Sequence, residues 1–149
     1  MFKINRQTDY AVRVLLALAK AGEGVRLSSG AIQQEMLIPP ALMSRIVAQL
    51  ARAELVNTFP GREGGLMLPR PASQITLKDV VEAFEGPILL SECLQARDED
   101  DCPFRSNCPV SSKWGRVQVA MLREMATVTF ESLAQEALSA PVKIPNIVM

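Results

Sequence analysis

Three cysteines, Cys93, Cys102 and Cys108, lie within sixteen residues of one another at the spacing C-x8-C-x5-C and are the whole cysteine content of the 149-residue chain. The residues between them are mostly polar and charged, whereas cysteines that only fill a core lie among apolar neighbours. An odd number of cysteines, in a chain expected in a reducing compartment, argues against a disulfide framework. The cysteine cluster therefore indicates metal or cluster binding.

The spacing of the cysteines favours an iron–sulfur cluster over zinc. Structural zinc sites use four ligands, commonly with paired cysteines two to four residues apart, and neither interval here fits that pattern. Separated thiolates in a loop can reach the irons of a cluster, and the pairs Cys102-Pro103 and Cys108-Pro109 are typical of such loops. Three thiolates leave one position for another ligand, which is an oxygen, a nitrogen from elsewhere or an exchangeable small molecule.

The chain contains no histidine, which excludes nucleophilic catalysis by a Cys-His or Ser-His pair. No paired carboxylates, phosphate-binding loop or cofactor fingerprint is apparent. The glycine-rich turn Gly61–Gly65 is expected to join two strands rather than to open a helix, so it is not a nucleotide loop. We therefore expect a protein that is not an enzyme.

The composition indicates one folded domain with appended elements, because 48% of the residues are hydrophobic and 21% are charged. The net charge is zero, but residues 1–72 carry an excess of four positive charges and residues 73–149 an excess of four negative ones. Such an asymmetry suggests that only the first half meets a polyanion. We find neither a signal peptide nor a membrane span, and we expect a cytoplasmic protein without a membrane partner.

The basic half has the pattern of a helix-turn-helix unit. A first amphipathic helix is expected from Thr8, as N-cap, to Gly22, and a second, shorter one after Ser28 or Ser29. Pro39-Pro40 then starts a third helix, whose apolar residues face inward while Ser44, Arg45 and Gln49 face away. Two helices joined by a tight turn, the second with an exposed polar face, are typical of DNA recognition.

A β-hairpin follows the third helix directly. The apolar runs 55–59 and 66–68 flank the turn Pro60–Gly65, which predicts two short strands that form a wing. Its glycines allow the backbone and Arg62 to approach DNA closely. The alternative for the exposed residues of the third helix is an ordinary solvated face. The candidate DNA contacts are Ser29, Ala41, Leu42, Ser44, Arg45, Gln49, Gly61 and Arg62.

Helices dominate the acidic half. Thr76 and Asp79 have the form of a capping box for a short helix ending near Gly86, and a longer helix is expected from Ser111 or Ser112. The longer helix carries two apolar stripes and so needs two partners, one of which we expect to be a second copy of the chain. Thr127–Thr129 should break it before a final helix from Phe130 to about Leu138.

The fold class predicted is therefore mainly α with a small β-hairpin wing. Its parts are a winged helix-turn-helix domain (1–72), a connecting helix (73–92), a cysteine loop (93–109), a dimerisation helix with a short C-terminal helix (110–138) and a tail (139–149).

Over about residues 1–138 the chain resembles the Rrf2 family of bacterial winged-helix regulators. The matching text is the opening TDYAVRVLLALA, the stretch LARAELVNTFPGREGGLMLPRPASQITLKDVVEAFEG, the cysteine spacing and a tryptophan, Trp114, six residues after the last cysteine. The resemblance implies a homodimer that binds double-stranded operator DNA. It also implies that Cys93, Cys102 and Cys108 ligate a two-iron (2Fe–2S) or four-iron (4Fe–4S) cluster whose state controls that binding.

The resemblance also bears on the fourth ligand. IscR-like members have a histidine three residues after the last cysteine, where this chain has Ser111. In NsrR-like members an aspartate in the opening helix supplies the ligand from the other subunit, which carries over to Asp9, so the chain is closer to these members. The alternative for Asp9 is an acidic residue that stabilises the start of a helix. In the wing, Pro60 occupies the position where many members have an arginine that enters the DNA groove. In this chain Arg62 is the residue expected to take that role.

These observations together predict a DNA-binding transcriptional regulator, acting as a repressor, whose operator affinity depends on a cluster that senses nitric oxide, redox state or iron status. The alternative is a regulator without a cluster, in which Cys102 and Cys108 oxidise to a disulfide.

Overall fold

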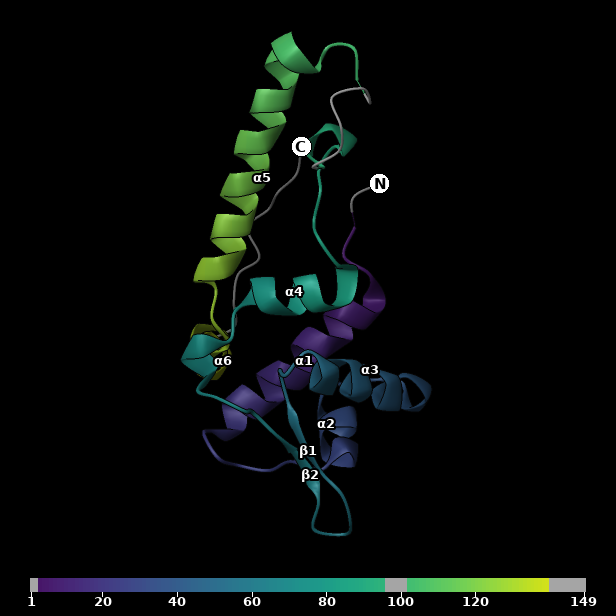
Figure 1. Cartoon of the computed structure of the whole chain (residues 1–149). Coiled ribbons are helices and arrows are strands. Elements are labelled where there is room, and N and C mark those ends of the chain that lie inside the picture. Colours follow the sequence, from purple (N-terminus) through teal and green to yellow (C-terminus); the bar gives the residue numbers. More distant parts are fainter. Residues whose placement is uncertain (1–2, 96–101, 140–149) are drawn as a thin grey trace.

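The computed structural model describes residues 3–95 and 102–139, which form a mainly helical fold with one two-stranded sheet, as predicted (Figure 1). The elements in chain order are α1 (Arg6–Ala21), α2 (Ser29–Glu35), α3 (Pro40–Arg52), β1 (Asn57–Phe59), β2 (Gly65–Met67), α4 (Leu77–Glu85), α5 (Pro109–Thr127) and α6 (Phe130–Ser139). Short 3-10 turns occupy Ala72–Gln74, Glu92–Leu94 and Arg105–Asn107. No helix among these residues is both long and apolar enough to cross a membrane.

Helix α1 is the centre of the fold and contacts α2, α3, α4 and α6. Its apolar stripe is buried because residues three and four positions apart share one helix face, with Val14, Leu15 and Leu18 at most 1% exposed. The prediction that Thr8 caps this helix is wrong, because α1 begins earlier. The side chain of Asn5 accepts a hydrogen bond from the Thr8 amide at 2.9 Å and caps the helix. Gly22 ends α1 as predicted, with φ at +102°.

Thr8 is instead a fully buried side chain that ties α1 to α4. Its hydroxyl donates to Oε1 of Glu85, the last residue of α4, at 2.5 Å. The same oxygen accepts from the backbone amide of Asn5 at 2.8 Å. A carboxylate at the positive end of α1 is also favoured by the helix dipole. The Thr8 hydroxyl, opposed in part by desolvation and assisted by Asn5, lowers the pKa of Glu85 below its ordinary value.

Helices α2 and α3 form the predicted helix-turn-helix. The Ser28 hydroxyl accepts from the Ala31 amide at 3.1 Å and caps α2, and Pro40 occupies the first position of α3, where a proline costs no hydrogen bond. Ile32 of α2 and Ile46 of α3 are fully buried against α1. Between the two helices Leu37 has φ at +52° and a side chain that is 79% exposed.

The wing is an antiparallel hairpin that pairs Asn57 with Met67 and Phe59 with Gly65. Its other edge is held by Leu27, whose amide and carbonyl both bond to Leu66, at 3.0 and 2.7 Å. This isolated bridge joins the segment before α2 to β2 and so connects the wing to the helix-turn-helix.

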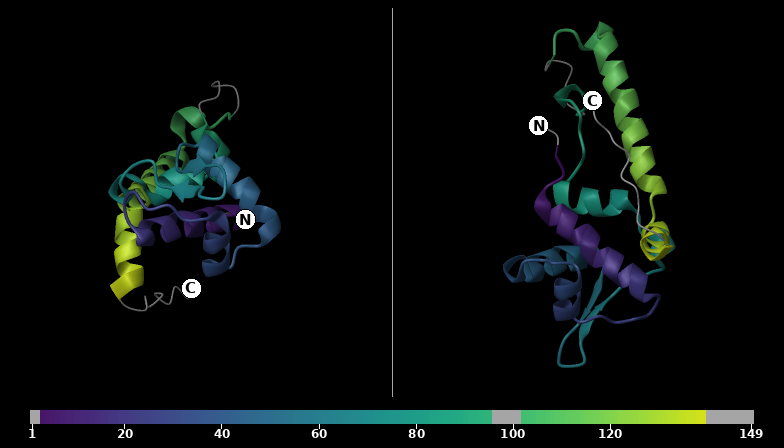
Figure 2. Two further views of the ribbon diagram at one scale, coloured as in Figure 1. Left: turned by 90° about the horizontal axis from the view of Figure 1, so that it is seen from below. Right: turned by 180° about the vertical axis from the view of Figure 1, so that it is seen from behind.

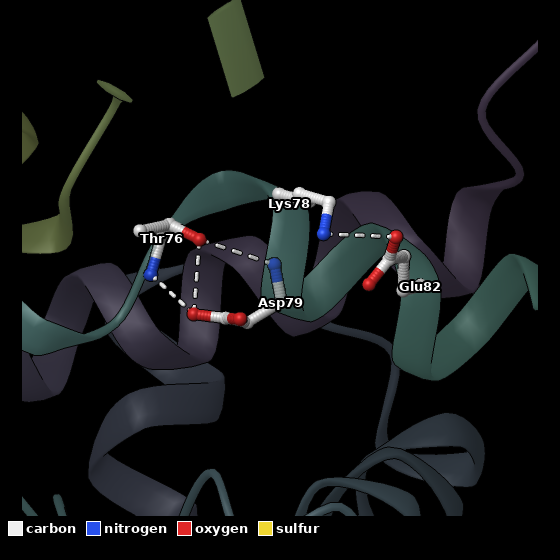
Figure 3. A network of polar contacts seen from close by, with 4 residues as sticks. All are labelled: Thr76, Lys78, Asp79 and Glu82. Atoms are coloured by element: carbon white, nitrogen blue, oxygen red, sulfur yellow. Dashed lines mark hydrogen bonds and ion pairs between the residues drawn. The ribbon is translucent and has the colours of Figure 1, made fainter. Parts of the chain in front are cut away.

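Helix α4 begins with the predicted capping box. Figure 3 shows the Thr76 hydroxyl accepting from the Asp79 amide at 3.3 Å, while the Asp79 carboxylate accepts from the Thr76 amide at 2.8 Å. Lys78 and Glu82 form an ion pair one turn apart at 3.2 Å. These contacts fix the start of a helix that packs on both α1 and α3.

Helix α6 returns to the same core. The Phe130 amide donates to the Ile75 carbonyl at 2.9 Å, and the Phe130 side chain is fully buried in the cluster that contains Val14 and Leu15. The core is therefore continuous across residue 72, and the predicted unit 110–138 divides in space into a projecting α5 and an α6 packed on α1. The predicted tail, beyond Ser139, lies outside the described residues.

Helix α5 extends away from α1, α2, α3 and the wing in the view from behind, while it still packs on α4 (Figure 2). The prediction that it starts at Ser111 or Ser112 is wrong: Cys108 is the N-cap and Pro109 the first helical residue, where its fixed φ suits a helix start. It ends at Thr127, as predicted, because Val128 is extended. No residue of α5 is buried, and its exposed apolar side chains are Val110, Trp114, Val117 and Val119.

The bond between Thr8 and Glu85 predicts a specific dependence of stability on pH. Because the folded state lowers the pKa of Glu85, its stabilising effect is present above the ordinary value of 4.5 and is lost as pH falls through the lowered pKa. Glu85 is exposed and solvent screens its interactions, so Glu85→Gln should cost at most about 1 kcal/mol of unfolding free energy at neutral pH and nothing in strong acid. Urea unfolding at a series of pH values measures this cost, with Glu136→Gln, an exposed residue of α6, as the control. An equal cost at both pH extremes would contradict it.

Candidate DNA interface and cysteine site

The first turn of α3 presents the predicted recognition face. Ala41, Ser44 and Arg45 are exposed, while Leu42 is half-buried and packs partly against the core. No side chain caps this helix end, Pro40 has no amide hydrogen, and the Leu42 amide bonds to the Pro39 carbonyl at 3.0 Å. The positive end of the helix dipole is therefore the main electrostatic feature of this end. The arrangement suits a ligand with acceptor groups, such as a phosphate or a base edge.

Gln49 does not belong to this face. Its side-chain amide donates to the Ala83 carbonyl of α4 at 3.0 Å and is partly buried there. The prediction that Gln49 faces away from the domain is therefore wrong. Helical spacing alone places Gln49 beside Arg45, but the sequence gives no sign that α4 packs on that side of α3.

A groove between α2, α3 and the wing gathers other predicted contacts. Ser29 of α2 and Gly61 and Arg62 of the wing turn line it together with Val47 and Thr58. Ser29, Gly61 and Arg62 are all exposed. The fold thus brings the start of α2 and the wing turn, which are separate in the sequence, to one surface.

Two glycines set the shape of the wing. A Cβ atom added to Gly64 would collide with the carbonyl oxygen of Phe59, so this position admits no side chain. Gly65 has φ at +143°, and a Cβ there would lie 2.5 Å from the Leu27 carbonyl oxygen. The close approach of three backbone segments at the base of the wing therefore depends on both glycines.

Arg26 is a cation at the wing that the sequence pattern did not single out. Its guanidinium carbon lies over the ring of Phe59, 3.7 Å from the ring centroid. The two residues are more than thirty positions apart in the chain, so no local spacing signals the contact. The pairing of Leu27 with Leu66 brings them together.

The start of α5, which Cys108 caps, lies at the opposite end of the molecule from the wing (Figure 1). Cys93 is in the turn Glu92–Leu94, Cys102 precedes the turn Arg105–Asn107, and Cys108 is the N-cap of α5. All three side chains are partly exposed and form no disulfide. The turn Glu92–Leu94 packs on α5, where Leu94 contacts the helix at Gly115.

The surroundings of Cys93 favour its thiolate. Its Sγ lies 3.1 Å from the Ser91 hydroxyl. Hydrogen bonding by Ser91 first, then by Ser111, lowers the pKa of Cys93, and the charge of Arg105 contributes in the same direction. Ser111 lies in the first turn of α5, one turn beyond Cys108, so Cys93 and Cys108 share the electropositive end of this helix.

The donor chemistry of these residues fits a cluster. Thiolates are the ligands that iron–sulfur clusters require, and the helix end offsets their negative charge. Within 3–95 and 102–139, no three cysteine or acidic side chains come together at the spacing of a single metal ion. Residues 96–101, which separate Cys93 from Cys102, lie outside the described part of the chain.

Asp9 occupies the exposed side of α1. Its carboxylate pairs with the Arg13 guanidinium at 2.8 Å, one helical turn away. Arg13 also donates to the Met36 carbonyl at 3.3 Å and lies 5.3 Å from the centre of the Tyr10 ring. Among the contacts of the described residues within one chain, Asp9 meets no cysteine, so its predicted role requires a second subunit.

Comparison with known proteins places this geometry among regulators. A family model named Rrf2 and described as an iron-dependent transcriptional regulator matches residues 4–136. Protein aau3 of Rhizobium meliloti is 36% identical over 134 residues, which cover 89% of this chain and 85% of that protein. The transcriptional regulator NsrR of Oceanobacillus iheyensis is 27% identical over 130 residues, covering 87% of this chain and 88% of NsrR.

Solved structures show the same fold. The global cysteine regulator CymR of B. subtilis superposes with a TM-score of 0.72 at 28% identity, covering 91% of this chain and 98% of CymR.

The glycine at position 64 provides a test of the wing. Gly64→Ala would force the turn away from Phe59, with about 1–3 kcal/mol of local strain. We expect DNA affinity to fall at least about tenfold while the helical core stays folded. Fluorescence anisotropy with a labelled duplex and thermal melting would measure both. In the control Gly115→Ala, the added Cβ meets Leu94 at an ordinary 3.7 Å, and equal losses in the two variants would contradict the prediction.

Proposed function

Because this chain belongs to the Rrf2 family of transcriptional regulators, we propose that it represses transcription as a homodimer on operator DNA, under the control of an iron–sulfur cluster held by Cys93, Cys102 and Cys108. Family members are regulators and not enzymes. The observation that carries the proposal is the groove lined by Ser29 of α2, Val47 of α3 and the wing turn, with the exposed Ser44 one helical turn before Val47.

In this proposal α3 reads bases in the major groove. Arg45 is suited to the two acceptors on the edge of guanine, and Ser44 to a base or a phosphate. Ser29 and the positive end of the α3 dipole bind phosphates, which fixes the register on the duplex. The wing turn at Gly61 and Arg62 follows the backbone or enters the minor groove beside it.

The exposed apolar side of α5 is where a second copy fits. Val110, Trp114 and Val117 are each 43–54% exposed, which is a large apolar surface for one helix to leave in water. A symmetric pair would present two α3 helices to half-sites about 34 Å apart. Palindromic operators would then match the twofold axis of the protein.

The cysteines would hold the cluster at the start of α5, and Asp9 of the partner subunit would complete its ligands. Ser91 and Ser111 favour the thiolate of Cys93, which is the form that binds iron. When bound, the cluster supplies a centre that nitric oxide, oxidants or iron shortage can attack. Ligands from two subunits would fix the position of the cysteine end of one copy against α1 of the other.

Rigid contacts connect the two ends within one chain. The turn Glu92–Leu94 and α4 both pack on α5, while α4 reaches α3 through Gln49 and α1 through Glu85. A shift of α5 would therefore move the recognition helix relative to its copy. A coupling of about 1–3 kcal/mol is enough to change affinity from fivefold to more than a hundredfold.

A second candidate is a thiol switch without a cluster. The similarity to CymR, a global cysteine regulator, favours it, as does the lowered pKa of Cys93, since thiolates oxidise readily. In this alternative a disulfide between Cys102 and Cys108 would alter the start of α5, because Cys108 caps that helix.

Metal content separates the two candidates. Protein purified without oxygen should contain iron and inorganic sulfide, Cys93→Ala should lose both, and Asp9→Asn should retain less than the wild type. Glu23→Gln, an exposed acid after the other end of α1, should change nothing. Iron-free wild-type protein that still binds DNA, and that forms the disulfide of Cys102 with Cys108 on oxidation, would support the thiol switch instead.

DNA recognition has its own test. Arg45→Ala should cost about 1–3 kcal/mol of binding free energy and relax the preference at one base position, because Arg45 is assigned a base contact. Selection of duplexes from a random pool by each protein would display the preference. The matched control is Arg123→Ala on α5, which removes an equal charge far from the wing. An equal loss of affinity for all DNA sequences would contradict the base contact and indicate that Arg45 contacts the DNA backbone.

A further inference from the structure

We infer that Arg26, stacked on Phe59, is a DNA-backbone contact of the wing, and that Phe59 serves to hold its guanidinium in place. This inference rests on the proposed function, since it assigns one more contact to the same DNA surface. The ligand chemistry is a phosphodiester oxygen of the duplex.

The stacking geometry follows from the register of the hairpin. Phe59 pairs with Gly65, so β2 places no side chain over the ring on that face. The pairing of Leu27 with Leu66 sets the preceding residue, Arg26, beside the same strand. The guanidinium carbon of Arg26 lies over the Phe59 ring, 3.7 Å from its centroid.

Stacking leaves the guanidinium able to bind an anion. A ring contact uses the flat face of the group, while the N–H donors lie in its plane and point outward. Arg26 is exposed, and none of the ion pairs formed by the described residues involves it. A cation held in a fixed orientation loses less side-chain entropy on binding than a free surface arginine does.

The position of the stack links it to the candidate interface. Phe59 is the last residue of β1 and lines the groove that also contains Ser29, Gly61 and Arg62. Pro60, the next residue, has neither charge nor amide hydrogen to offer a phosphate. Through its contact with Phe59, Arg26 therefore supplies a guanidinium beside the groove that Arg62 also lines.

Salt dependence distinguishes a phosphate contact from a purely structural one. Each phosphate contact that is lost should reduce the slope of log affinity against log salt by about one, equally for selected and random duplexes. The proposed homodimer carries two copies of Arg26, so for Arg26→Gln we expect the slope to fall by about two, with a loss of affinity of about three- to tenfold at moderate salt. Arg26→Lys should keep the slope near the wild-type value. Arg123→Gln, with the same charge change on α5, should leave both quantities unaltered.

Phe59→Leu tests the part assigned to the ring. It keeps an apolar side chain but removes the stacking surface, so the affinity should fall while the melting temperature stays within a few degrees of the wild type. An Arg26→Gln protein with an unchanged salt slope would overturn the inference and leave the proposed function intact. A wild-type protein that binds no duplex at all would overturn both.

Discussion

Burial of one face of α1 is the constraint on which the other parts of the molecule depend. Val14, Leu15 and Leu18 are covered by helices from both halves of the chain, so DNA-reading elements and acidic-half elements share a single core. Burying side chains of this size contributes about 1.5–3 kcal/mol each. The N-terminal end of the same helix is held by Glu85, which means that α4 cannot shift without disturbing the centre of the domain.

The fold places the start of α5, with Cys108, and the wing at opposite ends of the molecule. The wing depends on backbone contacts so close that Gly64 and Gly65 admit no side chain, and it is therefore stiff. At the end of the molecule that carries the cysteines, α5 has no buried residue and packs on the short turn Glu92–Leu94. Small energies can rearrange a weakly packed region, which suits the site proposed to sense a signal. A rigid region suits the wing, because the wing must keep a fixed register on DNA.

Local patterns predicted most of the elements, while contacts between distant segments escaped them. Spacing of apolar residues and capping side chains located α2, α3, the hairpin and the start of α4, since these signals act within a few residues. The predicted starts of α1 and α5 are a few residues late, because Asn5 caps α1 and Pro109 is the first residue of α5. The hydrogen bond from Gln49 to the Ala83 carbonyl of α4 and the stacking of Arg26 on Phe59 arise from tertiary packing, which local sequence patterns do not report.

The exposure of α5 has a consequence for how the protein responds to dilution. Helices of this length are only marginally stable in water without tertiary contacts, and α5 contributes no buried side chain of its own. Beyond its contacts with α4 and the turn Glu92–Leu94, any further stabilisation of α5 by a second copy in the proposed dimer would depend on protomer concentration. In the proposed dimer, dilution would weaken the contacts of α5 before those of the core around α1, so the amount of protein would affect the cysteine end before the DNA-reading end.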